Sequence, residues 1–236
     1  MRPHELASVG PFFALRTDEE EPAGAGGYLA PGREAVGIRV ETVGRRMGTE
    51  DRRVAASVAF QGIAGRLLSI GLGAVVLTGE VPDLRSGRLR WQPTLTAPDD
   101  LWLPGPVPAV PAERLADVVL DGRLVPLLGL MRDVVPVSPR LMRGNAGSAL
   151  AGALRVLHGW CRERGRAADA ERALAVARGL FRHPLLTGTG ELTVTAGGPV
   201  FVRDTCCLYY RVPAGAGMCG DCVLRHPPRS RTPGIR

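Results

Sequence analysis

The sequence predicts an α+β fold: a mostly helical domain with a small antiparallel sheet and a cysteine module at the C-terminal end. Three observations support this class. Apolar residues recur every three or four positions over several long stretches, which is the period of an amphipathic helix. The pattern changes to alternation around residues 192–203, which is typical of a β-hairpin. Four of the five cysteines then follow between positions 206 and 222.

Helical periodicity is strongest in three stretches. Thr49 can cap a helix that covers residues 56–67, and Asn145 can cap a second helix with an apolar face that ends at Cys161. Residues 167–181 form a third. Residues 113–135 are expected to be largely helical, with a break near Gly122 and Pro126. The apolar segment 72–77 fits a buried strand or a short helix, because periodicity does not separate these two.

Strand and loop signals occupy the rest of the chain. The first segment, to about residue 31, is predicted as a loop or a partly ordered lead-in because Gly, Pro and Glu are frequent in it. Residues 89–95 alternate as in a strand, and Pro93 favours an edge position. Residues 192–195 and 199–203 are expected to pair across the turn 196–198. The tail after Arg225, rich in Pro and Arg, is predicted to be disordered.

Composition narrows the classes of partner. The chain has 236 residues, of which 45% are hydrophobic, so one main core can be buried. The formal net charge is +7 and arginine supplies all of the positive side chains. These arginines are spread along the chain and form no basic run interleaved with aromatic residues, so nucleic-acid binding is not predicted. The charge is read as a solvated surface that could also attract an anionic partner.

The sequence predicts a soluble, cytoplasmic protein without a membrane span. The longest uncharged apolar run covers residues 67–79, whereas a spanning helix needs roughly 18 or more such residues. Nothing in the first residues resembles a targeting segment.

The cysteine pattern indicates metal or redox chemistry. Cys219 and Cys222 form a C-x-x-C pair, in which one tight turn can direct two thiolates to one metal. Cys206 and Cys207 are adjacent, and their Cα atoms lie about 3.8 Å apart, too close for an unstrained disulfide. Spacing alone leaves three interpretations open: a 2Fe–2S cluster, a structural zinc site, or disulfides and incidental thiols. The adjacent pair fits the usual zinc pattern of two short C-x-x-C elements poorly.

A family resemblance separates these alternatives. The segment from Arg203 to Pro213 (RDTCCLYYRVP), followed by CGDCVL from Cys219, resembles the C-terminal region of ferric-siderophore reductases of the FhuF type. More loosely, SVAFQG from Ser57, LWLP from Leu101 and GNAGSAL from Gly144 also look like this family. The resemblance implies that Cys206, Cys207, Cys219 and Cys222 bind a 2Fe–2S cluster.

The resemblance also implies a function and a domain division. Residues 1–190 would form a FhuF-like siderophore-binding region, and residues 191–236 would form the C-terminal 2Fe–2S cluster-binding region. The implied enzyme is an iron–sulfur oxidoreductase that reduces siderophore-bound Fe(III) by one electron and releases Fe(II) for iron assimilation. Its implied partners are a ferric siderophore, with the hydroxamate type as one candidate, and a reduced ferredoxin-like electron donor. The alternative is a non-enzymatic siderophore- or metal-binding protein, with a structural four-cysteine zinc site or a sensing cluster.

Two departures from the family pattern bear on the site. Eleven residues separate the cysteine pairs here, whereas the family usually has ten, and one extra residue in a Gly/Ala loop is inexpensive to close. Arg143 stands where an aromatic residue would be expected, which could alter the choice of substrate.

Several other residues have a predicted place in the site or in the core. Arg203, Arg211 and Arg225 are close enough in sequence to ease the addition of negative charge to a cluster. Gln61 could face a ligand from within an apolar helix. The aromatic and cysteine side chains outside the motif are expected mainly in the core; these are Trp91, Trp102 and Cys161.

Overall fold

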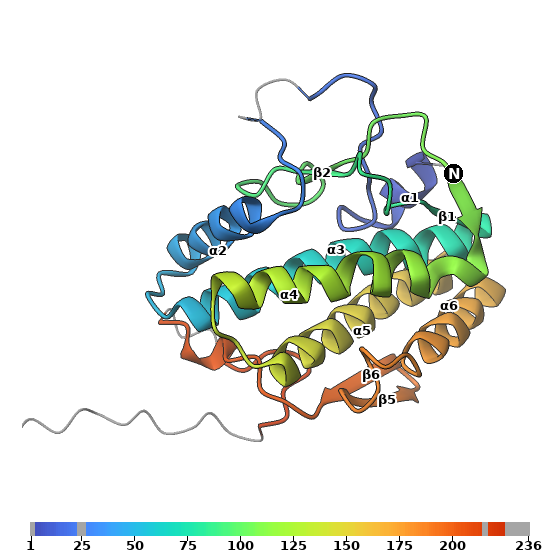
Figure 1. The fold of residues 1–236 in the computed structure, drawn as a ribbon. Coiled ribbons are helices and arrows are strands. Elements are labelled where there is room, and N and C mark those ends of the chain that lie inside the picture. The colour runs from blue at the N-terminus through green and yellow to red at the C-terminus, as the bar shows by residue number, and fades with distance from the viewer. Residues whose placement is uncertain (1–2, 23–26, 214–216, 225–236) are drawn as a thin grey trace, which may run out of the picture.

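A computed structural model describes residues 3–22, 27–213 and 217–224 and confirms the α+β class (Figure 1). The helices are α1 (Pro3–Val9), α2 (Arg33–Met47), α3 (Arg52–Thr78), α4 (Val125–Val134), α5 (Pro139–Glu163) and α6 (Ala167–Leu180). The strands form three separate antiparallel pairs, which are β1 (Glu80–Pro82) with β4 (Ala109–Pro111), β2 (Arg90–Trp91) with β3 (Leu101–Trp102), and β5 (Gly190–Thr195) with β6 (Gly198–Arg203).

Helix α3 is the central element of the core. Asp51 rather than Thr49 caps it, because the Asp51 carboxylate accepts a hydrogen bond from the Arg53 backbone N–H. The apolar segment 72–77 is no separate strand or short helix, since it continues α3 without a break. The glycines around it admit neighbours: a Cβ at Gly71 would lie 2.8 Å from Leu115. A helix that is buried on all sides shows no clear periodicity, and for that reason the sequence left this segment undecided.

Helix α3 is also long and apolar enough to cross a membrane. It is the one such helix within the described part of the chain, and 89% of its apolar window is buried by other elements. All of the run 67–79 except its last residue, which caps the helix, is therefore part of a 27-residue helix. Its burial is that of a core helix and is consistent with a soluble protein.

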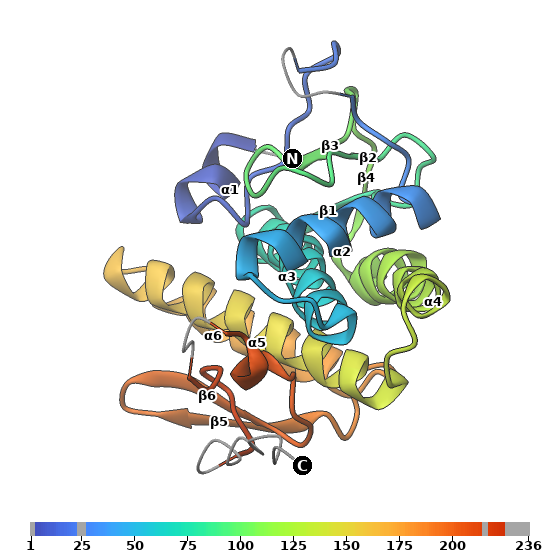
Figure 2. The ribbon, with the colours of Figure 1, turned by 90° about the vertical axis from the view of Figure 1, so that its left-hand side faces the viewer.

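Helix α5 packs along α3 and carries the C-terminal hairpin. It begins at Pro139, a position that favours the first turn, so Asn145 lies inside the helix and is not its cap. Figure 2 shows the β5–β6 hairpin against α5, on the side away from α2. The predicted hairpin is confirmed with Thr195 paired to Gly198, and it leads directly into Cys206.

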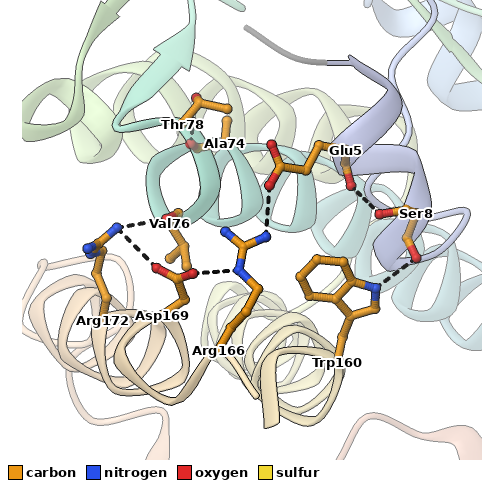
Figure 3. Close-up of polar contacts among 9 residues, drawn as sticks. All are labelled: Glu5, Ser8, Ala74, Val76, Thr78, Trp160, Arg166, Asp169 and Arg172. Carbon is orange, nitrogen blue, oxygen red and sulfur yellow. Dashed lines mark hydrogen bonds and ion pairs between the residues drawn. The ribbon is translucent and has the colours of Figure 1, made fainter. Parts of the chain in front are cut away.

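The N-terminal region contains helices that the sequence did not predict. Helices α1 and α2 lie within or next to the segment that was read as a loop. Figure 3 shows how α1 is held against the α5–α6 corner: Arg166 bridges Glu5 and Asp169 at 2.8 and 2.7 Å. Trp160 donates its indole N–H to the Ser8 carbonyl at 2.9 Å. These polar contacts join residues far apart in sequence, so local patterns do not reveal them.

The remaining predictions for elements are confirmed or shortened. The break expected near Gly122 is a π-helix (Ala116–Leu124) that runs into α4, with Pro126 in the first turn of α4. The strand expected over 89–95 is only β2. The helix expected over 167–181 is α6. The predicted disordered tail lies outside the described residues.

Candidate metal centre

The four C-terminal cysteines follow β6 within one short segment. Cys206 and Cys207 precede a 3-10 turn (Tyr209–Arg211), and Cys219 and Cys222 lie on a tight turn closed by a 3.1 Å hydrogen bond from the Cys222 N–H to the Cys219 carbonyl. In Figure 2 this segment (red) lies beside α5. All four thiols are free, as is Cys161, which is fully buried in α5 and has the predicted role of a small core residue.

The sulfur atoms have polar partners that suit thiolates. Cys207 and Cys219 are hydrogen-bonded to each other, and the Cys219 thiol lowers the pKa of Cys207 to about 7. The same contact raises the pKa of Cys219, so that the two sulfurs share one proton. The Leu208 N–H donates to Cys206 Sγ at 3.3 Å, and the Leu224 N–H donates to Cys222 Sγ at 3.4 Å.

Leu208 has an unusual backbone conformation. Its φ of 67° lies in the left-handed region, which branched side chains rarely adopt. No other described residue except glycine has a positive φ. Such strain gathers at functional sites, and here it aims an N–H at a cysteine sulfur.

The described cysteines show one close pair of sulfurs, Cys207 with Cys219. Within the described residues, no three Cys, His, Asp or Glu side chains converge on a point where a single ion could bind. A structural zinc site needs four ligands around one point. A 2Fe–2S cluster divides its four thiolates between two irons.

A buried positive charge lies beside these sulfurs. Arg203, the last residue of β6, is 0% exposed and lowers the pKa of both Cys207 and Cys219 by its charge. It makes no salt bridge with any described residue, and its Nη1 has no hydrogen-bond partner. A buried guanidinium without a counterion is costly, so the site is electrostatically suited to an anionic group. A cluster held by four thiolates is such a group.

Helices α3 and α5 hold the first cysteine pair through a buried chain of hydrogen bonds. Arg203 donates to the Asn145 side-chain oxygen, and Asn145 Nδ2 donates to Ser57 O and Oγ, both at 2.8 Å. Ser57 Oγ donates to the Cys207 carbonyl at 2.6 Å. The sequence placed Ser57 and Asn145 in family-like motifs but gave neither of them this role. Their signal was a polar residue within an apolar helical pattern.

A second set of polar contacts holds the Cys219–Cys222 turn. The Asp221 carboxylate accepts hydrogen bonds from Ser148 Oγ and Arg155 Nη1, each at 2.8 Å. The Asp221 carbonyl accepts from the Arg203 N–H at 3.1 Å. These three partners tie the turn to α5 and β6. The sequence did not predict Ser148, Arg155 or Asp221 as site residues.

Small residues on α5 make room for the cysteine segment. A Cβ at Gly144 would lie 2.1 Å from Thr205 Oγ1, and one at Gly147 would lie 2.4 Å from Thr189 Oγ1. The glycines in the motif that starts at Gly144 therefore allow β6 and its continuation to pack directly on the helix.

The other arginines near the motif have different surroundings. Arg211 forms a salt bridge with Asp51 at 2.9 Å, so its charge is already balanced. Arg225 lies outside the described residues, as does part of the eleven-residue loop between the cysteine pairs. Arg143 donates to the carbonyls of Pro184, Leu185 and Thr187, which is a structural role.

A cavity of about 780 Å³ lies next to the cysteines. Cys207 and Cys219 form part of its wall, together with small residues of α3 and α5 and with Phe12. Gln61 also lines it. Trp91 and Trp102 are buried in the β2–β3 region and do not line it, so their core role is confirmed.

The wall formed by Phe12 is held in place by a buried ion pair. Arg66 of α3 contacts Asp100 at 2.7 Å and also donates to the carbonyls of Pro11 and Phe12. The cavity therefore has one wall fixed from the core and another built from the cysteine segment.

Comparison with known proteins agrees with the motif. Residues 203–224 match a family model described as the FhuF 2Fe-2S C-terminal domain. No curated protein and no solved structure matches the chain. The matched segment contains all four clustered cysteines together with Arg203 and Asp221, and it points to a 2Fe–2S cluster. The cofactor expected from the sequence is thereby confirmed.

Proposed function

We propose that this chain, which ends in a FhuF-type 2Fe–2S domain, is a cytoplasmic ferric-siderophore reductase. Cys206, Cys207, Cys219 and Cys222 are the proposed ligands. Residues 191–236 would hold the cluster, and residues 1–190 would form most of the siderophore site.

The observation that carries this proposal is the cavity beside the cysteines. Its volume of about 780 Å³ falls within the range of small-molecule sites, roughly 300–1,000 Å³. Because Cys207 and Cys219 line it, a ferric complex bound there would lie within short reach of the proposed ligands. A binding protein without redox function would not need its ligand at this wall.

The chemistry requires one electron and no organic cofactor. When bound, the 2Fe–2S cluster supplies one-electron transfer. The proposed donor is a reduced ferredoxin-like protein, which loses one electron. The proposed acceptor is siderophore-bound Fe(III), which becomes Fe(II) and leaves its oxygen ligands, since these hold the ferrous ion far less tightly.

The chain's own residues prepare the site for this reaction. The hydrogen-bond chain through Asn145 and Ser57 fixes the first cysteine pair, and Asp221 fixes the second. The cavity wall holds the ferric complex in place. Arg203 offsets the negative charge that gathers on the cysteine side.

The test is reoxidation of the reduced protein by ferric siderophores under anaerobic conditions. The protein would be reduced with dithionite, desalted, and mixed with a panel that includes hydroxamate complexes while the visible absorption is followed. We expect rapid recovery of the oxidised spectrum together with release of Fe(II). No reoxidation by any complex would contradict the reductase function.

A variant with a side chain that fills the cavity tests whether the ferric complex binds there. Gly152 of α5 lines the cavity, and the neighbour that a Cβ there would meet is Arg155 Nη2 at 4.0 Å. Gly152→Leu should therefore occupy part of the cavity and slow reoxidation roughly tenfold. Gly159→Leu is the matched control, because Gly159 is in the same helix, has open space and lies outside the cavity. Equal rates for both variants would show that the ferric complex binds elsewhere.

A further inference from the structure

We propose that Asn145 positions Arg203 as a fixed positive charge that raises the reduction potential of the cluster. The proposal depends on the cluster-binding part of the function above and is independent of the siderophore. Asn145 and Arg203 are positioning residues here, since neither is proposed to touch the reacting atoms.

The guanidinium of Arg203 is held rigidly. It is fully buried at the end of β6, where Nε donates to the Thr205 carbonyl and Nη2 to Asn145 Oδ1. A Cβ on Gly144 would lie 3.1 Å from Nη2, so the glycine leaves room on α5 for the guanidinium beside the Asn145 side chain. Its Nη1 remains without a partner among the described residues.

The orientation of Asn145 is fixed by what Ser57 can offer. Ser57 Oγ donates its proton to the Cys207 carbonyl, so toward Asn145 it can only accept. The Ser57 carbonyl also accepts. The amide nitrogen of Asn145 must therefore face Ser57, which leaves its oxygen facing Arg203. The hydrogen bonds thus all run in one direction, from Arg203 through Asn145 and Ser57 to the Cys207 carbonyl, and they hold the arginine beside Cys207.

The nearby carboxylate does not cancel this charge. The Asp221 carbonyl accepts a hydrogen bond from the Arg203 N–H, but the Asp221 carboxylate is bound by Ser148 and Arg155. No described carboxylate therefore balances the charge of Arg203, and the hydrogen bonds through Asn145 and Ser57 hold it next to the Cys207 backbone. One-electron reduction adds negative charge to a site that is already anionic, so a fixed cation favours the reduced state.

The test is a redox titration of the cluster-loaded protein in the absence of any siderophore. Asn145→Asp would place a carboxylate against Arg203, and Arg203→Gln would remove the positive charge. Both should lower the midpoint potential. Arg203→Lys keeps the charge and should remain close to the wild type. Gly159→Asp, about 20 Å further along α5, controls for added negative charge in general and should shift the potential less.

Two results would overturn the proposal. One is an unchanged midpoint potential in loaded Asn145→Asp and Arg203→Gln. The other is loss of the cluster in both Arg203→Gln and Arg203→Lys together with an unchanged midpoint potential in Asn145→Asp. The shape of the arginine, and not its charge, would then be what the site requires. Cluster loss in Arg203→Gln that Arg203→Lys restores would support the requirement for charge. None of these outcomes depends on whether the protein reduces siderophores.

Discussion

Cys207 and Cys219 form a pair of sulfurs that share a proton in the cluster-free protein. The Cys219 thiol donates toward Cys207, and the Arg203 charge acts in the same direction, while burial opposes both. The result is a Cys207 thiol that ionises near neutral pH. Because a cysteine must lose its proton to bind a metal, this lower pKa favours metal loading at neutral pH. A neighbouring cysteine can thus prepare a ligand before the metal arrives.

The pH dependence of alkylation tests this pair. In the cluster-free protein, a small alkylating reagent should modify Cys207 at a rate that rises with pH through about 7, because only the thiolate reacts. Cys161 should require higher pH, since burial raises its pKa. Peptide mapping by mass spectrometry separates the two sites. A Cys207 profile with its midpoint near 9 would contradict the shared proton.

The sequence was most informative about single residues that carry chemistry. The four cysteines and the charge near them were evident from spacing and from the family motif. Ser57 escaped functional assignment because its partner, the Cys207 carbonyl, is 150 residues away in the chain. Local spacing cannot report a contact of that range.

At the scale of elements, periodicity succeeded where one face of a segment is buried. The β5–β6 hairpin and α6 have such a face, and both were predicted closely. Periodicity failed for α3, which is buried on all sides. The capping prediction failed for Asn145, a good cap residue that lies inside α5. In that case a buried tertiary contact outweighed the intrinsic preference of asparagine for helix ends.

The packing of the cysteine segment on α5 depends on Gly144. A methyl group there would lie 2.1 Å from Thr205 Oγ1, so Gly144→Ala should force the two apart. We expect a loss of about 1–3 kcal/mol in unfolding free energy and a lower cluster content. Urea unfolding and iron analysis measure the two effects.

The matched control for this substitution is Gly159→Ala in the same helix. Nothing lies within 4 Å of a Cβ at that position, so alanine should stabilise the helix by up to roughly 1 kcal/mol. If Gly144→Ala changed the unfolding free energy and the cluster content no more than Gly159→Ala does, the close approach of Thr205 to Gly144 would not contribute to stability.

At the scale of the whole molecule, the helical region and the cysteine segment line one cavity together. The cavity is lined by α3 and α5 as well as by Cys207 and Cys219, so neither region alone would enclose it. The proposed division at residue 190 separates two stretches of sequence that both line the cavity proposed as the siderophore site. The sequence predicted the helices and the cysteine segment separately. Tertiary packing brings them together around the cavity, and local sequence patterns do not report such contacts.

The most direct test of the central claim is iron and sulfide analysis of anaerobically purified cysteine variants. Serine at position 206, 207, 219 or 222 should sharply reduce both iron and inorganic sulfide and bleach the visible charge-transfer absorption. Cys161→Ser should leave all three at the wild-type level, because Cys161 is a buried core residue. Undiminished iron and sulfide in Cys219→Ser would contradict the assignment of the four ligands.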